Sequence, residues 1–267
     1  MVIDCLSTGN SRIIEHKFGA RSMDIPNGSF NHDLTRNLGV SLANGELIYF
    51  TTQDAWLAED NMLEKMSSHF NDPKVMAVVG MQAVPHEEDK DPAKWFTRIS
   101  EPVIETREFP ENTFSDLPLA TQFKFSSWDN VNAMYRKQAL QKIPFTKTNY
   151  AEDWLWARAA LNAGMKLIRD PSIVVYHYHH MSFKYIFKEK FVINYQFYLN
   201  YKVKPSFPSF ISFIKSGYYI IKKKELTLKS RIYWLSHNVS QYLGHLFSIT
   251  FFRITLFLGN EEALTRV

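Results

Sequence analysis

The chain has 267 residues, of which 45% are hydrophobic and 22% are charged, with a formal net charge of +4. Its 21 Phe, 13 Tyr and 6 Trp exclude a disordered chain, and the small net charge does not call for nucleic acid as a partner. The single cysteine, Cys5, excludes an intrachain disulfide and a cysteine-based zinc cluster, so a reducing, cytoplasmic compartment is expected.

The N-terminal third alternates between short apolar strands and amphipathic helices. Strands are expected at Val2–Leu6, Ala20–Ile25, Leu47–Phe50 and Val75–Val79, and helices at Arg12–Phe18, Leu34–Ala43 and from Asp60 or Asn61 to Phe70. This β-α-β-α-β alternation predicts an α/β fold with a mostly parallel sheet flanked by helices. Because the chain opens directly on a strand, no secretory signal is expected.

The middle of the chain is less regular. Trp95–Glu108 is a candidate helix, and Pro110–Lys124 reads either as an excursion that contacts an acceptor or as a solvated loop. A helix is expected over Glu152–Ala163 and a strand near Ile173–Tyr176.

From Ser182 onward the sequence is rich in aromatic and basic residues. Helices are expected over Phe183–Tyr201, Phe207–Lys223 and Ser230–Leu258. The apolar stretch 242–258 contains His245 and Arg253 and is shorter than the ~20 residues that a spanning helix needs, which favours a buried or interfacial helix. We expect one domain over residues 1–200 and a helical extension over 201–267.

An acidic side chain follows the best strand of the chain, Leu47–Phe50. Gln53-Asp54-Ala55 stands at this strand end, where an open α/β sheet can hold a cation and a phosphate. A hard cation such as Mg²⁺ or Mn²⁺ accepts one carboxylate together with water and phosphate oxygens. The alternative is that Asp54 only caps the loop before the next helix.

Two carboxylates open the helix that begins at Glu152. The helix dipole stabilises Glu152 and Asp153 there, so one of them can act as a base while the other bonds to backbone or sugar. The alternative is that both are ordinary first-turn residues of a helix.

His177 and His179 lie two residues apart next to a predicted strand. This spacing puts both imidazoles on one face, where one can complete a cation shell or contact a diphosphate. The alternatives are solvated histidines at a strand edge, or a zinc site with His180, for which the sequence offers no carboxylate nearby.

Several short motifs occur in a fixed order along residues 1–200. They are Asn31-His32, Arg36-Asn37-Leu38-Gly39, Phe50 to Ala55, Gly80-Met81-Gln82, Ser127 to Asn132, Pro144-Phe145, Glu152-Asp153 with Trp156-Ala157, and the His177/His179 pair. This ordered set resembles the bacterial family 2 glycosyltransferases, most closely their rhamnosyltransferase-like branch. Each motif is weak alone, and their order makes the set specific.

The resemblance implies a GT-A fold, in which a Rossmann-like sheet is joined to a smaller acceptor-binding part. It implies an inverting transfer with Asp153 as base, Glu152 as its companion and a divalent cation, Mg²⁺ or Mn²⁺. The implied donor-binding residues are Asp4, Arg36, Asn37, Gln53, Asp54, Gln82 and Asn130, and the implied metal ligands are Asp54, His177 and His179.

The implied function is sugar transfer in bacterial surface polysaccharide synthesis, with rhamnose as a candidate sugar. The partners are a dTDP- or UDP-sugar donor and a glycan or lipid-linked acceptor. The C-terminal extension, with Lys222-Lys223-Lys224, suits peripheral contact with the inner face of the cell membrane, or else completes the core or a dimer interface.

The chain departs from the family pattern at its beginning. That pattern opens with an apolar strand and a Pro-Thr-x-Asn-like turn that grips the nucleotide base, whereas Val2-Ile3-Asp4 matches the second strand. The absent strand is expected to lie inside the sheet. A fragment, a mis-started reading frame and a catalytically silent binding or scaffold protein are therefore alternatives to an active transferase, and a metal-dependent hydrolase that uses His177 and His179 is a third function.

Overall fold

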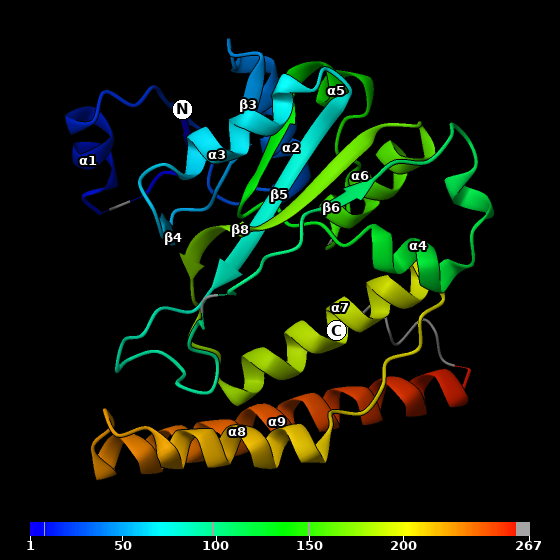
Figure 1. Cartoon of the computed structure of the whole chain (residues 1–267). Coiled ribbons are helices and arrows are strands. Elements are labelled where there is room, and N and C mark those ends of the chain that lie inside the picture. Colours follow the sequence, from blue (N-terminus) through cyan, green and yellow to red (C-terminus); the bar gives the residue numbers. More distant parts are fainter. Residues whose placement is uncertain (8, 98, 149, 260–267) are drawn as a thin grey trace.

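A six-stranded sheet forms the centre of the structure, a computed structural model that describes residues 1–7, 9–97, 99–148 and 150–259 (Figure 1). The strands are β1 (Val2–Asp4), β2 (Ser22–Asp24), β3 (Leu47–Phe50), β4 (Ala55–Leu57), β5 (Val75–Ala83), β6 (Glu105–Arg107), β7 (Ala133–Arg136) and β8 (Lys166–His177). The helices are α1 (Ser11–Lys17), α2 (His32–Leu42), α3 (Met62–Ser68), α4 (Leu119–Phe125), α5 (Lys137–Lys142), α6 (Glu152–Asn162), α7 (Phe183–Tyr201), α8 (Phe210–Lys222) and α9 (Leu228–Phe257), with 3₁₀ turns η1 (His69–Asn71) and η2 (Phe114–Asp116).

The sheet is mixed, with the order β3-β7-β5-β8-β4 and with β6 paired to the first half of β8. Strands β3, β5 and β8 run in one direction, whereas β7, β4 and β6 run against them. The α/β class and the flanking helices are confirmed, but the expectation of a mostly parallel sheet is wrong. The alternation of elements near the N-terminus could not show that β7, from far along the chain, inserts antiparallel between β3 and β5.

Hydrophobic residues cover both faces of this sheet. Along β5, Ala77 and Val79 face a larger cluster with α5 and α6, while Val78 faces a smaller cluster with α3. The same alternation holds in β7 and β8, because successive side chains of a strand point to opposite faces. The sheet is therefore the middle layer of a three-layer sandwich, and its ends are left free for a site.

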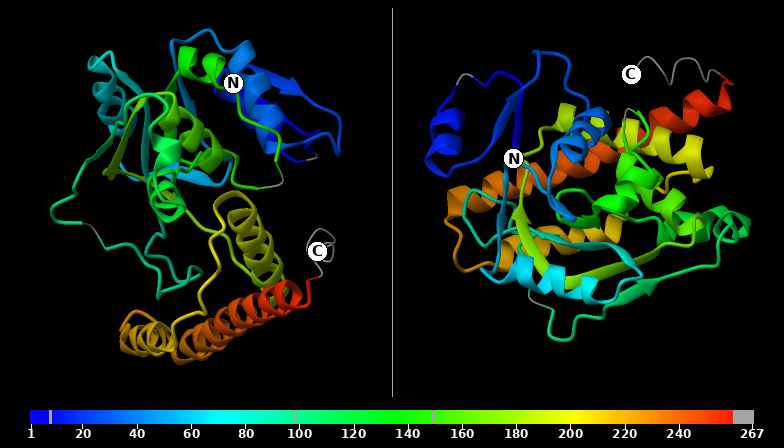
Figure 2. Two further views of the ribbon diagram at one scale, coloured as in Figure 1. Left: turned by 90° about the vertical axis from the view of Figure 1, so that its right-hand side faces the viewer. Right: turned by 90° about the horizontal axis from the view of Figure 1, so that it is seen from above.

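Strands β1 and β2 form a separate parallel pair outside the six-stranded sheet. Figure 2 shows this pair with α1 at one side of the molecule, and β3 is the end strand of the larger sheet. Ile3 of β1 packs toward α2, close to Gly39. The expectation of a further strand inside the sheet stays a prediction.

A break in register occurs where β5 passes β8. Val79 pairs with Arg169 and Met81 pairs with Val174, so that four residues of β8, from 170 to 173, stand opposite Gly80 alone. A Cβ at Gly80 would collide with the Asn132 side chain and the Ile173 carbonyl oxygen, so only glycine fits there. Such a bulge redirects the residues beyond it, here toward the ends of β5 and β8.

The long helices α7, α8 and α9 form a layer below the sheet (Figures 1 and 2). Helix α7 packs on α9 through Phe191 and Phe252, and its last residue, Tyr201, donates a hydrogen bond to the Trp154 carbonyl oxygen at 3.3 Å. At the other end of the layer Trp234 of α9 donates to the Glu88 carbonyl oxygen at 3.1 Å. The expected boundary at residue 200 falls at the end of α7, and a division into two domains stays a prediction.

The expected helices of the C-terminal part are confirmed, and α7 spans the expected residues 183–201. No helix among the described residues has both the length and the apolar character needed to cross a membrane. The candidate helix Trp95–Glu108 is wrong, since the described part of that segment holds the short strand β6 and no helix. Pro110–Lys124 is more ordered than expected, because it includes η2 and most of α4.

Candidate functional site

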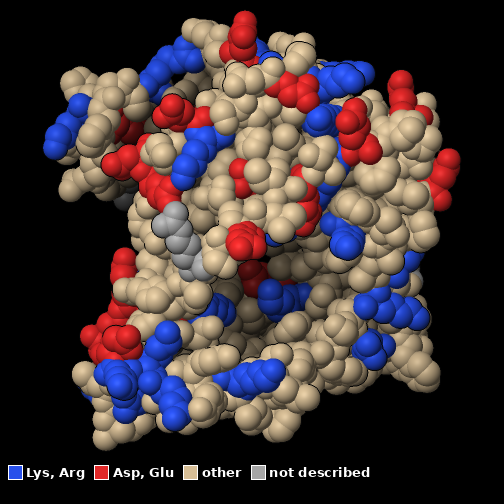
Figure 3. Space-filling model, in the orientation of Figure 1, with Lys and Arg blue, Asp and Glu red and all other residues tan. Residues whose placement is uncertain are grey.

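A cleft of about 920 Å³ opens at the carboxyl ends of β5 and β8. Its wall comes from α2, the segment 127–131, the start of α6, the end of β8 and the first half of α7. Figure 3 shows the surface hollowed near its middle, with acidic and basic side chains at the mouth of the hollow. An open crevice at the carboxyl ends of strands is where α/β sheets bind ligands.

One end of the cleft carries a cluster of possible metal ligands. The Nε2 atoms of His177 and His179 lie 3.3 and 3.2 Å from the two carboxylate oxygens of Asp54. One ligand atom from each of these three residues lies within 4.8 Å of the others. Two imidazoles and one carboxylate are donors that a divalent cation accepts, so this cluster can hold one.

The carboxylate of Asp54 is ready to act as a ligand. Partial burial acts to raise its pKa, but Thr52, His177 and His179 outweigh that effect, so the pKa of Asp54 is lowered. The Asp54 side chain is 35% exposed and that of His179 is 54% exposed, which leaves this end of the cleft open to a ligand.

A chain of hydrogen bonds fixes the orientation of His177. Its Nδ1 lies 2.6 Å from Oε1 of Gln82, which can only accept, so Nδ1 donates this hydrogen bond and Nε2 is the ring nitrogen that faces Asp54. The amide nitrogen of Gln82 in turn donates to the Asp129 carboxylate. Gln82 therefore fixes the tautomer and the ring orientation of His177, as hydrogen-bond partners of metal-bound histidines do.

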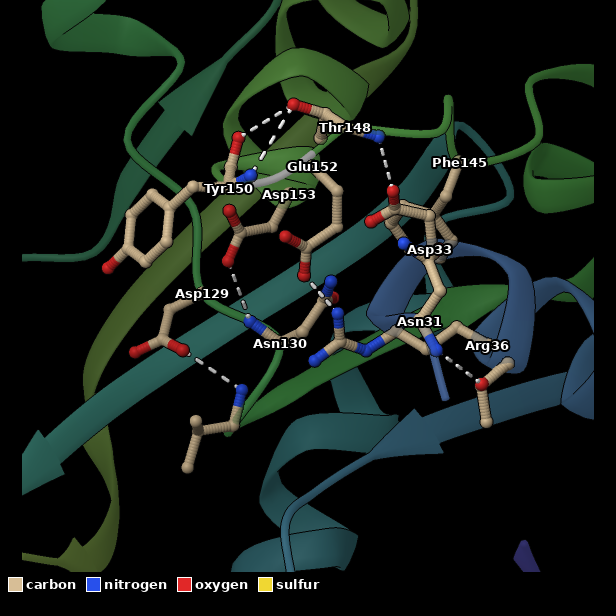
Figure 4. Close-up of polar contacts among 12 residues, drawn as sticks. Asn31, Asp33, Arg36, Asp129, Asn130, Phe145, Thr148, Tyr150, Glu152 and Asp153 are labelled. Atoms are coloured by element: carbon tan, nitrogen blue, oxygen red, sulfur yellow. Dashed lines mark hydrogen bonds and ion pairs between the residues drawn. The ribbon is translucent and has the colours of Figure 1, made fainter. Parts of the chain in front are cut away.

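The other end of the cleft is acidic (Figure 4). Glu152 and Asp153 open α6, directly after Ala151, whose backbone has φ of +66°. A non-glycine residue in this left-handed region is strained, and such strain is common where a site is held in a fixed geometry. Asp153 accepts hydrogen bonds from the backbone N–H groups of Trp154 at 2.8 Å and Asn130 at 3.3 Å.

Asp153 carries a carboxyl group whose charged form is disfavoured. Burial raises its pKa well above the usual aspartate value, and the neighbouring charges of Glu152 and Asp129 raise it further. A carboxylate with a raised pKa is a stronger base than an exposed one, so this group is suited to accept a proton from a hydroxyl.

Glu152 is held by a partner from a distant part of the chain. Arg36 of α2 forms an ion pair with it, and the two side chains are only 15% and 11% exposed (Figure 4). The guanidinium of Arg36, predicted to contact the donor, thus faces a carboxylate in this structure. The pair ties α2 to the start of α6 and so fixes one wall of the cleft.

The segment 127–131 contacts Asp153 through a backbone hydrogen bond. Asn130 is buried and its side-chain oxygen accepts a hydrogen bond from the Tyr135 hydroxyl, so the contact with Asp153 comes from its backbone. Asp129, in the same segment, accepts from the backbone N–H of Val131 at 2.9 Å and from Gln82. Asp129 belongs to the Ser127 to Asn132 motif, but only the folded chain shows that it stands between the two ends of the cleft.

Besides Asp54, which meets the cleft through His177 and His179, three predicted donor residues lie apart from the residues that line this cleft in the described part of the chain. Asp4 bonds the backbone and hydroxyl of Ser7, at 3.1 and 2.6 Å. Asn37 exchanges two hydrogen bonds with the backbone of Phe145, at 2.8 and 3.0 Å, and Gln53 is exposed in the turn before Asp54. Their roles in donor binding stay predictions.

The alternative zinc site with three histidines is not formed. His180 turns away from His177 and His179 toward α9, where its Nε2 lies 2.9 Å from the Tyr233 hydroxyl. The carboxylate that the sequence did not offer nearby is supplied by Asp54 instead. The cluster is therefore two histidines and one aspartate.

A comparison with protein families decides which kind of protein carries this cleft. The family model described as Glycosyl transferase family 2 matches residues 11–144. The chain belongs to glycosyl transferase family 2. The match confirms the resemblance that the ordered motifs of the sequence indicate.

Two relatives place the family 2 chain near a named branch. It is 32% identical over 195 residues to the O-antigen chain rhamnosyltransferase WbaN of Salmonella anatum, a match that covers 72% of this chain and 60% of the relative. It is also 32% identical over 163 residues to the O-antigen chain rhamnosyltransferase RfbN of Salmonella typhimurium, covering 58% of this chain and 49% of the relative. The chain thus spans about half to three fifths of the length of these curated relatives.

A solved structure supports the fold. The mannosyltransferase PcManGT from Pyrobaculum calidifontis, in complex with GDP-Man and Mn²⁺, matches the family 2 chain with a TM-score of 0.52 at 12% identity. The match covers 91% of this chain and 75% of that one. The likeness confirms the GT-A fold of the family 2 chain.

Proposed function

We propose that this chain is the catalytic part of an inverting glycosyltransferase that moves a sugar from a nucleotide diphosphate to a glycan acceptor. One observation carries the proposal: the Asp54–His177–His179 cluster and the buried carboxylate of Asp153 flank a single cleft. A sugar nucleotide needs a cation at its diphosphate and a base near its anomeric carbon, and the cleft offers one candidate for each.

The donor diphosphate is proposed to lie at the cation end. Asp54, His177 and His179 would hold a divalent cation, Mg²⁺ or Mn²⁺, which would supply positive charge to the leaving diphosphate. Gln82 keeps His177 in the tautomer that presents Nε2. The other predicted donor residues, Asp4, Arg36, Asn37, Gln53 and Asn130, await tests by substitution.

The acceptor hydroxyl is proposed to approach Asp153. Its oxygen forms a bond to the anomeric carbon while the bond from that carbon to the diphosphate oxygen breaks, and its proton passes to Asp153. Attack from the face opposite to the leaving group inverts the anomeric centre. Glu152 lies beside it, held by Arg36, and its charge helps to keep the pKa of Asp153 high.

The donor and acceptor classes are proposed from the relatives. Their names describe rhamnosyltransferases of O-antigen chains, so a deoxyhexose donor such as dTDP-rhamnose is the first candidate, with UDP-sugars second. The acceptor would be a growing surface glycan carried on a lipid. The chain would then work in the cytoplasm as a peripheral protein at the inner face of the cell membrane.

The proposal is tested by release of nucleoside diphosphate from dTDP-rhamnose, UDP-GlcNAc and GDP-mannose, with Mg²⁺ or Mn²⁺ and with EDTA. We expect turnover of one donor, lost with EDTA and in Asp54→Asn, and unchanged in the exposed matched control Asp60→Asn. No turnover, together with no calorimetric binding of dTDP, UDP or GDP, would instead establish the silent binding protein.

A further inference from the structure

The C-terminal layer presents an apolar surface on the side away from the sheet. On α8, Ile211, Ile214, Tyr218 and Ile221 are each more than half exposed and are spaced so that they share one helical face. The opposite face of α8, with the buried Ile220, packs against α9. Four large apolar residues in one exposed stripe exceed what scattered surface hydrophobics explain.

Helix α9 continues this surface. Its buried residues, among them His237, Ser248 and Phe252, recur at helical spacing on the side that meets α7. Leu228, Ile232, Val239, Ile254 and Phe257 are exposed and lie away from that side. The second half of α9 packs on α7 and its first half packs on α8, so the helix presents its side, not its end, to a partner (Figures 1 and 2).

The charge of this layer identifies the partner. Residues 202–259 contain nine lysines and arginines and a single acid, Glu225. Lys215 and Lys222 flank the stripe on α8, and the ammonium of Lys222 lies 5.5 Å from the ring centre of Tyr218. Figure 3 shows basic side chains gathered at the lower left, in the region where Figure 1 places the turn between α8 and α9.

From these observations we infer that the outer face of α8 and α9 is a docking surface for an anionic lipid bilayer. The apolar stripes enter the boundary between headgroups and acyl chains, and the lysines bind the lipid phosphates. A second copy of the chain is a poorer occupant, because it would bring together two 202–259 segments that each carry nine basic residues and one acid.

The position of the surface relative to the cleft gives it a use. Tyr185 and Glu189 of α7 line the cleft, while the same helix packs on α9. Two helices in succession, α7 and then α9, each about 10 Å across, therefore separate the cleft from the docking surface. Docking there would bring a lipid-linked acceptor to Asp153, and only this purpose rests on the proposed function. Lipid binding itself does not depend on catalysis.

The inference is tested by flotation with vesicles of phosphatidylcholine alone and of equal parts phosphatidylcholine and phosphatidylglycerol. We expect the chain to float only with the anionic vesicles, and less so at high salt. Ile211→Glu/Ile214→Glu should lower the apparent partitioning by more than about tenfold. The matched control is Ile13→Glu/Ile14→Glu on α1, where the exposures of 68% and 55% resemble the 67% and 53% on α8.

Two further measurements separate this inference from the proposed function. Asp153→Asn should float like the unmodified chain, and Ile211→Glu/Ile214→Glu should keep its turnover of soluble donor and its circular dichroism spectrum. Equal flotation of the α8 and α1 variants would overturn the inference. A concentration-dependent dimer that the α8 variant abolishes, without lipid binding, would also overturn it and assign the surface to self-association.

Discussion

The two ends of the cleft differ in how the fold builds them. At the cation end, Gln82 of β5 and His177 of β8 meet Asp54, which lies in the turn between β3 and β4, and the partly exposed Asp54 and His179 leave this end open to a ligand. The acidic end is assembled from separate segments, with Asp153 buried, Ala151 in a left-handed backbone and Glu152 held by Arg36. The strands of the sheet position the side chains of the cation end. At the acidic end, the surrounding structure holds a buried carboxyl group and a strained backbone, both of which cost free energy of folding.

The largest effect should come from removing the base at the acidic end. Asp153→Asn should lower transfer by about 10² to 10⁴, because no group remains to accept the acceptor proton. The same change should raise Tm at neutral pH. The raised pKa of Asp153 makes its ionised form destabilising at pH above that pKa, and this loss of stability vanishes below the unfolded pKa near 4.

Asp116→Asn is the matched control, since Asp116 is exposed in η2. It should change neither the rate nor Tm. A Tm of Asp153→Asn that falls at neutral pH would show that the acidic end is not under strain, and the contrast with the cation end would be lost.

The next effect concerns the ion pair that braces the acidic end. Arg36→Met should cost about 3–5 kcal/mol of unfolding free energy, because it leaves the buried charge of Glu152 without a partner. Chemical denaturation checks this. The double variant Arg36→Met/Glu152→Gln should recover most of the loss, and a loss that persists in the double variant would assign the cost to packing of the arginine stem.

A smaller effect is expected at the cation end. Gln82→Leu should weaken binding of Mn²⁺ by about 10–100-fold, since His177 loses the acceptor that fixes its tautomer. Calorimetry with Mn²⁺ measures this without any reaction. Gln53→Leu makes the same change at an exposed neighbour of Asp54 and should bind Mn²⁺ normally; equal weakening in both variants would contradict the positioning role of Gln82.

The smallest effect links the two ends. The charge of Asp129 raises the pKa of Asp153, so Asp129→Asn should move the acid limb of the kcat/KM profile to lower pH. The single amide oxygen can still accept the hydrogen bond from Gln82, with loss of the bond from Val131, so binding of Mn²⁺ should change little. An acid limb that stays in place would mean that Asp153 is not the group that titrates.

The sequence predicts more of the cation end than of the acidic end, because local spacing predicts neighbours within a strand but not contacts between distant segments. Strand periodicity places His177 and His179 on one face, and their ring centres lie 4.5 Å apart. The pair of Arg36 and Glu152 joins residues 116 positions apart, and Gln82 meets Asp129 across 47 positions. No local pattern encodes such contacts.

Strand β8 is longer than the sequence predicts. The sequence predicts a strand only near Ile173–Tyr176, whereas β8 begins at Lys166 and contains Pro171, which cannot donate to a strand ladder. The strand runs through this point because Pro171 lies in the stretch that faces Gly80 alone, where the ladder is interrupted and no N–H is needed from proline.

The double contact of α7 has a consequence for building hybrid proteins. This helix contributes Tyr185 and Glu189 to the cleft and Phe191 to the packing with α9. A deletion that keeps α7 but ends after residue 204 would uncover Phe191 and Tyr198. A hybrid that exchanges α8 and α9 between relatives should therefore exchange α7 as well. The three helices, with the part of the cleft wall that α7 contributes, form the segment to be exchanged.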